Sequence, residues 1–263
     1  MIKNSLILLF CVLFLVSCIA SRDGLPRNYR SFDARDIPNA IPKVEPRSRY
    51  GNPSSYVVLG KRYHVLKNAR CYRAKGIASW YGTAFHQRLT SSREPYNMYK
   101  MTAASKILPL PTYVRVTNLK NGRKIIVRVN DRGPFHTNRI IDLSFAAAKK
   151  IGMMGTGTAL VEVEAIDPRH PNASCGKRST SHKETHPKIY LQLGAFNTKH
   201  NADRLANKLA RETQQSIHVI ISKTRYAYIY KVQIGPIKDV NIADAITERL
   251  KGKGFGEAFA VVR

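Results

Sequence analysis

Glu94 and Asp131 are the two side chains in this sequence that are best placed for acid–base chemistry. Asp131 follows Lys124–Asn130, where apolar and charged residues alternate as they do in a half-buried strand. The pair Gly133–Pro134 then ends the strand, so the Asp131 carboxyl is expected to project from a sheet edge into a cleft. A purely structural alternative is that Asp131 caps a turn or pairs with Arg132.

The elements that would position these carboxyls lie within residues 71–167. Alternating segments predict further strands at Gly76–Gly82, Tyr113–Thr117 and Thr158–Ile166. Asn121–Gly122 predicts a type I′ hairpin turn, and Thr102–Ser105 predicts a helical turn capped by its threonine. Phe145–Ile151 predicts a short helix that ends at Gly152. Many short strands with few helices predict a mainly β domain, a compact β-barrel.

Residues 188–263 predict a second domain with the order strand, helix, strand, strand, helix, strand. The strands are expected at Ile189–Phe196, Ile217–Ser222, Tyr226–Ile234 and Phe259–Val262. Apolar stripes at helical spacing lie between the first two strands and between the last two. This order is that of a ferredoxin-like α+β sandwich (βαββαβ), whose open sheet face can bind a polymer.

The first residues of the chain resemble a lipoprotein export signal. The apolar run Ser5–Val16 is too short for a comfortable membrane span and indicates a signal peptide over residues 1–17. The tetrad ending at Cys18 resembles a bacterial lipobox, in which cleavage leaves that cysteine as a lipidated N-terminus. An ordinary secretory cleavage, with Cys18 incidental, is the alternative. Ile19, in place of Asp, resembles the sorting pattern for the outer membrane.

Two segments predict linkers. Residues 18–70 are rich in Pro, Ser, Arg and Asn and predict a tether from the membrane, within which Ser55–Val65 could form an ordered strand or a hairpin. Residues 168–187 are rich in Pro, Ser, Lys and His and predict a linker between the two domains.

The formal net charge of +27 over 263 residues predicts an anionic partner or surface, unless the excess Lys and Arg side chains form solvated faces. Export disfavours nucleic acid as that partner and permits disulfide bonds. Cys71 and Cys175 flank the barrel, and a bridge between them could join its two ends. No CxxC pair exists, so neither a thioredoxin-like site nor a zinc site is expected. No motif for a nucleotide or redox cofactor is visible.

The central domain resembles the double-psi β-barrel of the rare lipoprotein A family, and the second domain resembles the SPOR domain. The barrel motifs are Gly76–Gly82, Phe85–His86, Thr102–Ala104, Leu108–Pro111, Val114–Leu119, Asn121–Arg123, Arg128–Phe135 and Arg139–Ser144. The SPOR motifs are Gln192–Phe196 and Val232–Pro236.

This resemblance implies a lytic transglycosylase that cuts the glycan strands of peptidoglycan. It implies that the family's two functional acids are Asp131 and Glu94, so that one carboxyl donates a proton to the leaving oxygen and one group accepts a proton from the nucleophile. In this reaction class the nucleophile is the sugar's own primary hydroxyl, and an anhydro-sugar end forms. Asp131 is the expected acid, and Glu94 is the expected base or cation stabiliser.

The sequence departs from the family pattern near the site. Ser105 stands where the family usually has His and is a poorer proton shuttle at neutral pH. Ser91–Arg93 replaces Ala-Asn-Gly before Glu94, and Gln87 replaces a Gly. A catalytically weak or inactive glycan-binding lipoprotein is therefore the leading alternative. His86 could assist in place of the missing His, or could be a structural or surface His.

Substrate contacts are expected on both domains. In the barrel, Tyr81 could stack on a sugar ring and Arg132 could bind substrate. In the SPOR domain, the candidates for glycan contact are Gln192, Phe196 and Gln233, although Phe196 could instead pack under the first helix.

The resemblance further implies that the SPOR domain binds strands stripped of stem peptides, which gather at division septa. The expected location is the bacterial cell envelope, lipid-anchored in the outer membrane and facing the periplasm. Other wall or division proteins are possible partners. A third reading is an envelope structural protein whose basic surface grips anionic lipid or wall polymer.

Overall fold

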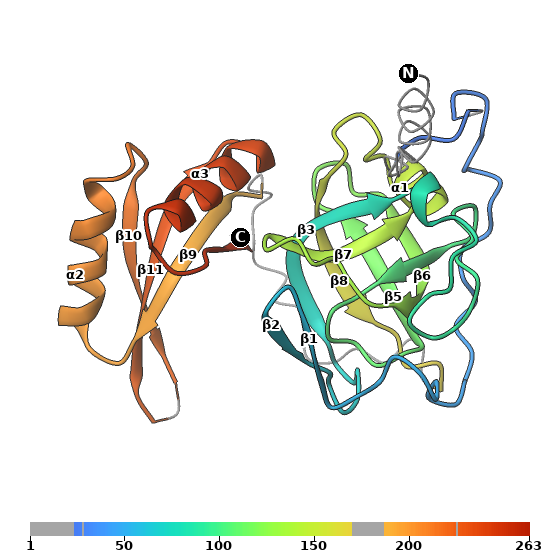
Figure 1. Ribbon diagram of the computed structural model, residues 1–263, viewed down its shortest axis with the longest axis horizontal. Coiled ribbons are helices and arrows are strands. Elements are labelled where there is room, and N and C mark those ends of the chain that lie inside the picture. Colours follow the sequence, from blue (N-terminus) through green and yellow to red (C-terminus); the bar gives the residue numbers. More distant parts are fainter. Residues whose placement is uncertain (1–23, 28, 170–186, 225) are drawn as a thin grey trace, which may run out of the picture.

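The computed structural model describes residues 24–27, 29–169, 187–224 and 226–263. Within them the chain forms a closed barrel, mostly green to yellow in Figure 1, followed by an α+β domain in orange and red. The predicted signal peptide, the predicted lipidation site Cys18, and Cys175 lie outside the described residues. Cys71 is disulfide-bonded. None of the helices in the described ranges is long and apolar enough to cross a membrane.

Six strands close the barrel in the order β3-β7-β4-β6-β5-β8. Their bounds are β3 Arg73–Tyr81, β4 Thr102–Ala104, β5 Thr112–Asn118, β6 Lys124–Asp131, β7 Arg139–Ser144 and β8 Ala159–Ala165. The pairs β3–β7 and β4–β6 are parallel, and the other pairs are antiparallel. Aliphatic side chains such as Val114, Val127 and Leu143 are fully buried in the barrel's core, as period-two alternation requires. The predicted barrel is confirmed.

Two short helices accompany the barrel: the 3-10 helix η1 (Thr83–Phe85) and α1 (Phe145–Lys150). The Ser144 hydroxyl caps α1 by accepting a hydrogen bond from the Ala147 N–H at 3.2 Å. Gly152, at φ +79°, follows the helix in the left-handed conformation that ends helices. Both features confirm the predicted helix.

Two local predictions in the barrel are wrong. Thr102–Ala104 is not a helical turn but strand β4, since it pairs with β6 on one side and β7 on the other. These pairings are distant in sequence and override the local helical preference. The hairpin at Asn121–Gly122 forms, but only Gly122 in its loop has a positive φ, +72°, whereas a type I′ turn needs two such residues.

The second domain is a four-stranded antiparallel sheet in the order β10-β11-β9-β12. The elements are β9 Ile189–Phe196, α2 Lys199–Ala210, β10 Ile217–Lys223, β11 Tyr228–Ile237, α3 Val240–Gly252 and β12 Phe259–Val262. Leu191, Val232 and Ile234 from the sheet pack with Leu209 of α2 and Leu250 of α3 in one buried cluster. The predicted ferredoxin-like order is confirmed.

Residues 24–70, which the sequence predicts as part of a tether, lie against the barrel as the blue chain of Figure 1. Their backbone bonds to barrel segments, for example from Ala40 N–H to Ile126 O at 3.0 Å and from Ser48 N–H to Leu110 O at 2.8 Å. The expected hairpin is present as β1 (Ser55–Val58) and β2 (Lys61–His64). We call residues 24–70 the N-terminal segment.

The two domains touch through polar side chains at the start of β7. Arg139 forms an ion pair with Asp244 of α3 at 2.6 Å, and Asn138 donates to Asp244 at 2.9 Å and to Thr247 at 3.0 Å. Ile77 of β3, fully buried, packs into the hydrophobic cluster of the second domain. The contact therefore combines an apolar patch with a buried charge pair.

Candidate active site

Asp131 lies at the end of β6, where a β-bulge interrupts the pairing with β4. Ala103 pairs with Val129 and Ala104 pairs with Asp131, so Asn130 is the extra residue of the bulge. Bulges of this kind re-aim side chains beside active sites. The Asp131 side chain is half-buried, consistent with its predicted place at a strand end.

One oxygen of Asp131 is held by neutral donors. Its Oδ1 accepts hydrogen bonds from the Ser91 N–H, the Ser91 hydroxyl and the Arg132 N–H, each at 2.7 Å. Within the described residues no hydrogen bond reaches Oδ2. The carboxyl is thus fixed in orientation through Oδ1, and Oδ2 is the oxygen available for chemistry.

Glu94 is held by a cation. Its Oε2 accepts from Arg128 Nη1 at 2.7 Å and from Asn130 Nδ2 at 2.9 Å. Partial burial would raise the pKa of Glu94, but the hydrogen bonds and charge of Arg128 and Asn130 outweigh it and hold the pKa below its ordinary value. Glu94 is therefore ionised at neutral pH.

The fold brings the two carboxyls to one junction. Asn130, which binds Glu94, is the chain neighbour of Asp131, which binds Ser91. Glu94 is itself the last residue of the loop Thr90–Glu94, and Asp131 binds Ser91 near the start of that loop. That loop is closed by a hydrogen bond from the Thr90 N–H to the Glu94 carbonyl at 2.8 Å.

The replaced glycines keep a glycine-like backbone. Gln87 and Arg93 adopt φ of 67° and 68°, in the left-handed region that L-residues rarely occupy. The Arg93 N–H donates to Thr90 O at 2.9 Å, and its guanidinium lies 4.5 Å from the centroid of the Tyr50 ring. The two substitutions therefore place strained backbone at Gln87 and Arg93, while the hydrogen bonds that close the loop Thr90–Glu94 are kept.

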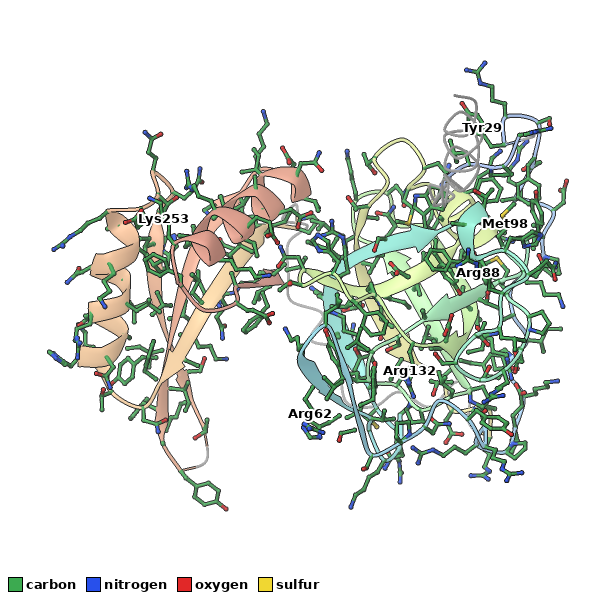
Figure 2. The ribbon with its side chains drawn as sticks, viewed as in Figure 1. Tyr29, Arg62, Arg88, Met98, Arg132 and Lys253 are labelled. Atoms are coloured by element: carbon green, nitrogen blue, oxygen red, sulfur yellow. The ribbon has the colours of Figure 1, made fainter. Side chains whose placement is uncertain are left out.

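Arg132 binds the protein rather than standing free in the cleft. Its guanidinium donates to Gly51 O at 2.7 Å, Ser105 O at 3.0 Å, Leu108 O at 2.6 Å and Asn52 Oδ1 at 3.1 Å. Burial lowers the pKa of Arg132 to about 10, so the group stays protonated at neutral pH. Figure 2 shows it in the lower part of the barrel, far from Tyr29 at the top. Four of its five N–H groups are committed to these acceptors.

Tyr81 is buried and does not offer its ring to a substrate in this structure. It stacks on Tyr96 with ring centroids 4.1 Å apart. Its hydroxyl has no hydrogen-bond partner among the described residues, and burial raises the pKa of Tyr81 well above its usual range. The Tyr81 ring therefore has no exposed face on which a sugar ring could stack in the way that the sequence predicts.

His86 and Ser105 both bond to backbone instead of to either acid. His86 Nδ1 accepts from the Met98 N–H at 3.4 Å. Ser105 is buried, and its hydroxyl accepts from the Ile107 and Leu108 N–H groups at 3.4 and 3.3 Å. Ser105 fixes the turn after β4 and, through its N–H to Asp131 O at 3.0 Å, the end of β6.

The three residues predicted to contact glycan in the SPOR domain, Gln192, Phe196 and Gln233, are all buried or partly buried. Gln233 Nε2 donates to Gln192 Oε1 at 3.0 Å, and Arg263 donates to Gln233 Oε1 at 2.7 Å. Both glutamines are buried, and Phe196 packs against the helix-covered core. Gln192 and Gln233 are thus cross-strand partners, whereas Phe196 pairs with Tyr230 further along β9. Arg263, which the sequence did not reveal, binds this glutamine pair.

Three residues around Glu94 were not predicted from the sequence: Arg128 and Asn130, which bind it, and Glu45, which binds Arg128. Arg128 and Asn130 both bind Glu94, and their spacing of two residues along β6, directly before Asp131, is a signal that could have been used. Glu45 binds Arg128 with both oxygens, each at 2.9 Å, and accepts from the Tyr113 hydroxyl. No local pattern could reveal Glu45, because its partner lies 83 residues away.

The closed six-stranded barrel and the βαββαβ domain that follows it define a class of two-domain proteins. The profile of the lytic transglycolase family (DPBB_1) matches residues 73–163, and that of the SPOR domain matches residues 185–262. A relative from Vibrio cholerae, named endolytic peptidoglycan transglycosylase RlpA, is 40% identical over 85% of this chain and 81% of its own. The chain belongs to the RlpA family.

Two further comparisons concern Pseudomonas aeruginosa. Its endolytic peptidoglycan transglycosylase RlpA (strain UCBPP-PA14) is 58% identical over 147 residues, which are 56% of this chain and 42% of that protein. The match thus spans less than half of that relative's length. Among solved structures, the RlpA SPOR domain from this organism aligns with 28% of this chain and 96% of its own, with 23% identity and a TM-score of 0.27.

Proposed function

We propose that this protein is an endolytic peptidoglycan transglycosylase that cleaves glycan strands and leaves anhydro-muramyl ends. The observation that carries the proposal is the contrast between two carboxyls at one junction. Glu94 is paired with the Arg128 cation, whereas Asp131 is held by neutral N–H and O–H donors. Paired carboxyls in contrasting environments are the arrangement that separates acid from base. The RlpA relatives from Pseudomonas aeruginosa and Vibrio cholerae are named endolytic peptidoglycan transglycosylases, which supports the same activity.

The reaction assigns one proton transfer to each acid. Asp131 donates a proton from Oδ2 to the glycosidic oxygen as the C1–O bond breaks. Glu94, anionic beside Arg128, stabilises the developing oxocarbenium ion and accepts the proton of the sugar's C6 hydroxyl as that oxygen bonds to C1. The proton then returns to Asp131 through solvent. No water is added across the cleaved bond, so the product ends in an anhydro sugar.

The SPOR domain would supply the preference for strands without stem peptides, through polar groups at the surface of its sheet. Such strands gather at division septa, so septal enrichment follows from this binding. We place the protein in the cell envelope, with an acyl anchor on Cys18 in the outer membrane. Other wall or division proteins remain candidate partners.

The test is mass spectrometry of purified, peptide-free glycan strands incubated with the protein, beside Asp131→Asn and Glu94→Gln variants. We expect anhydro-ended fragments from the parent, none from Asp131→Asn, and at least about 100-fold slower release from Glu94→Gln. Reducing-ended fragments would show that the bond is hydrolysed and would refute the transglycosylase mechanism. Glycan binding without fragments from the parent would mean a non-catalytic binding protein.

A further inference from the structure

A hollow of about 360 Å³ opens beside Asp131. One wall comes from the barrel, namely Ser91, Arg132 and Phe135. Ser91 and Arg132 are also the residues whose N–H groups hold Asp131 Oδ1 at 2.7 Å. The hollow and the proposed acid therefore share their supports, and a group bound in one is adjacent to the other.

The other wall comes from the N-terminal segment, outside the matched barrel region. Gly51, Tyr56 and Val58 line this side. A Cβ on Gly51 would lie 2.7 Å from Ser91 O, so only glycine allows this close approach. Its carbonyl also accepts from Arg132, which fastens the two walls together. We call the hollow the Tyr56 pocket.

The pocket is mainly apolar, and Tyr56 is held in it by a hydrogen bond and by neighbouring side chains. The Tyr56 hydroxyl donates to Lys106 O at 2.8 Å, and its ring stacks on Tyr63 with centroids 5.4 Å apart. Arg132 also lies over this ring, 5.9 Å from the centroid. Because the ring is already packed by these groups, the pocket suits a small apolar substituent better than a whole sugar face.

The position of the pocket indicates which substituent. A proton donated by Asp131 goes to the oxygen on C1 of the sugar, and the next carbon of an amino sugar carries an acetamido group. The acetamido methyl matches the apolar lining. The amide oxygen matches the one guanidinium N–H of Arg132 that has no acceptor among the described residues.

We propose that the Tyr56 pocket receives the C2 acetamido group of the sugar whose glycosidic bond is cleaved, and that residues 51–58 thereby select N-acetylated glycan. This proposal rests on the proposed function for its substrate. It assigns a specificity role to the N-terminal segment, which the sequence predicts only as a tether.

The test uses two neutral substrates that differ by one methyl group. Peptide-free strands are de-N-acetylated and then re-acylated with either acetyl or formyl groups. Wild-type kcat/KM should be about tenfold higher for the acetyl strands, the value of one methyl in a fitted pocket. Equal kcat/KM for the two substrates would overturn the pocket assignment and leave the proposed function standing.

Two tryptophan variants of one strand provide the matched comparison. Val58→Trp fills the pocket, whereas Val57→Trp changes the neighbouring residue, which is 52% exposed and does not line it. Val58→Trp should remove the acetyl-over-formyl preference through a loss on acetyl strands of about tenfold. Val57→Trp should behave as wild type. An equal loss on both substrates, or none, would overturn the proposal.

Binding separates this proposal from the proposed activity. Tetrasaccharides of N-acetyl- and N-formylglucosamine are titrated by calorimetry into the wild type and both variants. An acetyl preference that Val58→Trp abolishes, in a protein that releases no fragments, would support the pocket and refute the transglycosylase. If Val58→Trp lowers Tm markedly, Val58→Ala replaces it, with an expected loss of preference of about threefold.

Discussion

Arg128 sets the charge state of Glu94, since it supplies both the shorter hydrogen bond and the positive charge at that carboxyl. It is itself neutralised on the other side by Glu45. Hydrogen bonds to Glu45 and Glu94 raise the pKa of Arg128 despite its burial, so the cation persists throughout the physiological range. Arg128 therefore sets the pH range in which Glu94, the proposed base, is ionised.

We predict that Arg128→Gln shifts the acid limb of the kcat–pH profile to higher pH. The folded pKa of Glu94 lies below its ordinary value, so removing the cation raises that pKa and the base is protonated at less acidic pH. Arg115→Gln on the adjacent strand, whose partner is Glu164, is the control and should leave the limb unchanged. An unmoved limb in Arg128→Gln would show that another group limits the rate.

Gln87 gives a prediction about stability. Its φ of 67° is strained for a residue with a Cβ, and it is exposed. Gln87→Gly should raise the free energy of unfolding by about 0.5–1 kcal/mol. Arg88→Gly, at a neighbouring exposed residue without positive φ, should lower it by a similar amount. Denaturant unfolding measures both, and a destabilised Gln87→Gly would refute strain at this position.

At the scale of elements, the N-terminal segment is part of the barrel's structure. Asn52 shows how it is attached, since its side chain accepts from the Leu110 N–H at 2.8 Å and donates to the carbonyls of Leu110 and Ser48. The same oxygen accepts from Arg132. One amide therefore joins the segment to the turn before β5 and to the residue after Asp131.

We predict that Asn52→Ala lowers the free energy of unfolding by about 2–3 kcal/mol, because it leaves buried backbone groups without partners. It should also reduce kcat/KM, since Arg132, the residue after Asp131, loses its hydrogen bond to the Asn52 side chain. Asn68→Ala is the control, because Asn68 is exposed and accepts only from the Arg70 N–H two residues on. Equal effects of the two substitutions, measured by urea unfolding, would contradict the assigned role.

The sequence revealed elements whose signals are local and missed those made by distant pairing. Lys124–Asp131 alternates strictly enough to define β6, and Ser144 with Gly152 marks both ends of α1. Thr102–Ala104 carries no strand signal, because its conformation is imposed by β6 and β7. The site divides in the same way: the acids are identified by motif, whereas Glu45 binds Arg128 across 83 residues and Asn52 binds Arg132 across 80 residues.

At the scale of the whole molecule, the Arg139–Asp244 pair joins the two domains. Arg139 and Asp244 side chains are 8% and 21% exposed. Asp244→Asn removes the charge that balances Arg139 and should cost about 2–3 kcal/mol. Calorimetry should then resolve the barrel and SPOR domain as separate transitions. Asp203→Asn, in an exposed ion pair with Lys199, should change little, and identical traces for both variants would argue against coupling.

The same pair gives the docked state a pH dependence. Burial would raise the pKa of Asp244, but hydrogen bonds from Arg139 and Asn138 hold it below its ordinary value. Its stabilisation is therefore present above the unfolded pKa of about 4 and is lost as pH falls through the lower folded value. Domain separation, followed by small-angle scattering, should begin below pH 4 in the wild type. Asp244→Asn should be separated at neutral pH as well.

The packing of the N-terminal segment limits how far the barrel can lie from the proposed anchor. Gly24 O accepts a hydrogen bond from the Thr83 N–H at 3.2 Å, and Gly24 lies six residues after Cys18. For a chain anchored at Cys18, as proposed, those residues span at most about 20 Å when fully extended. A tether of residues 18–70 would have reached well over 100 Å. With so short a tether, the barrel would reach only the layer of peptidoglycan that lies directly against the membrane.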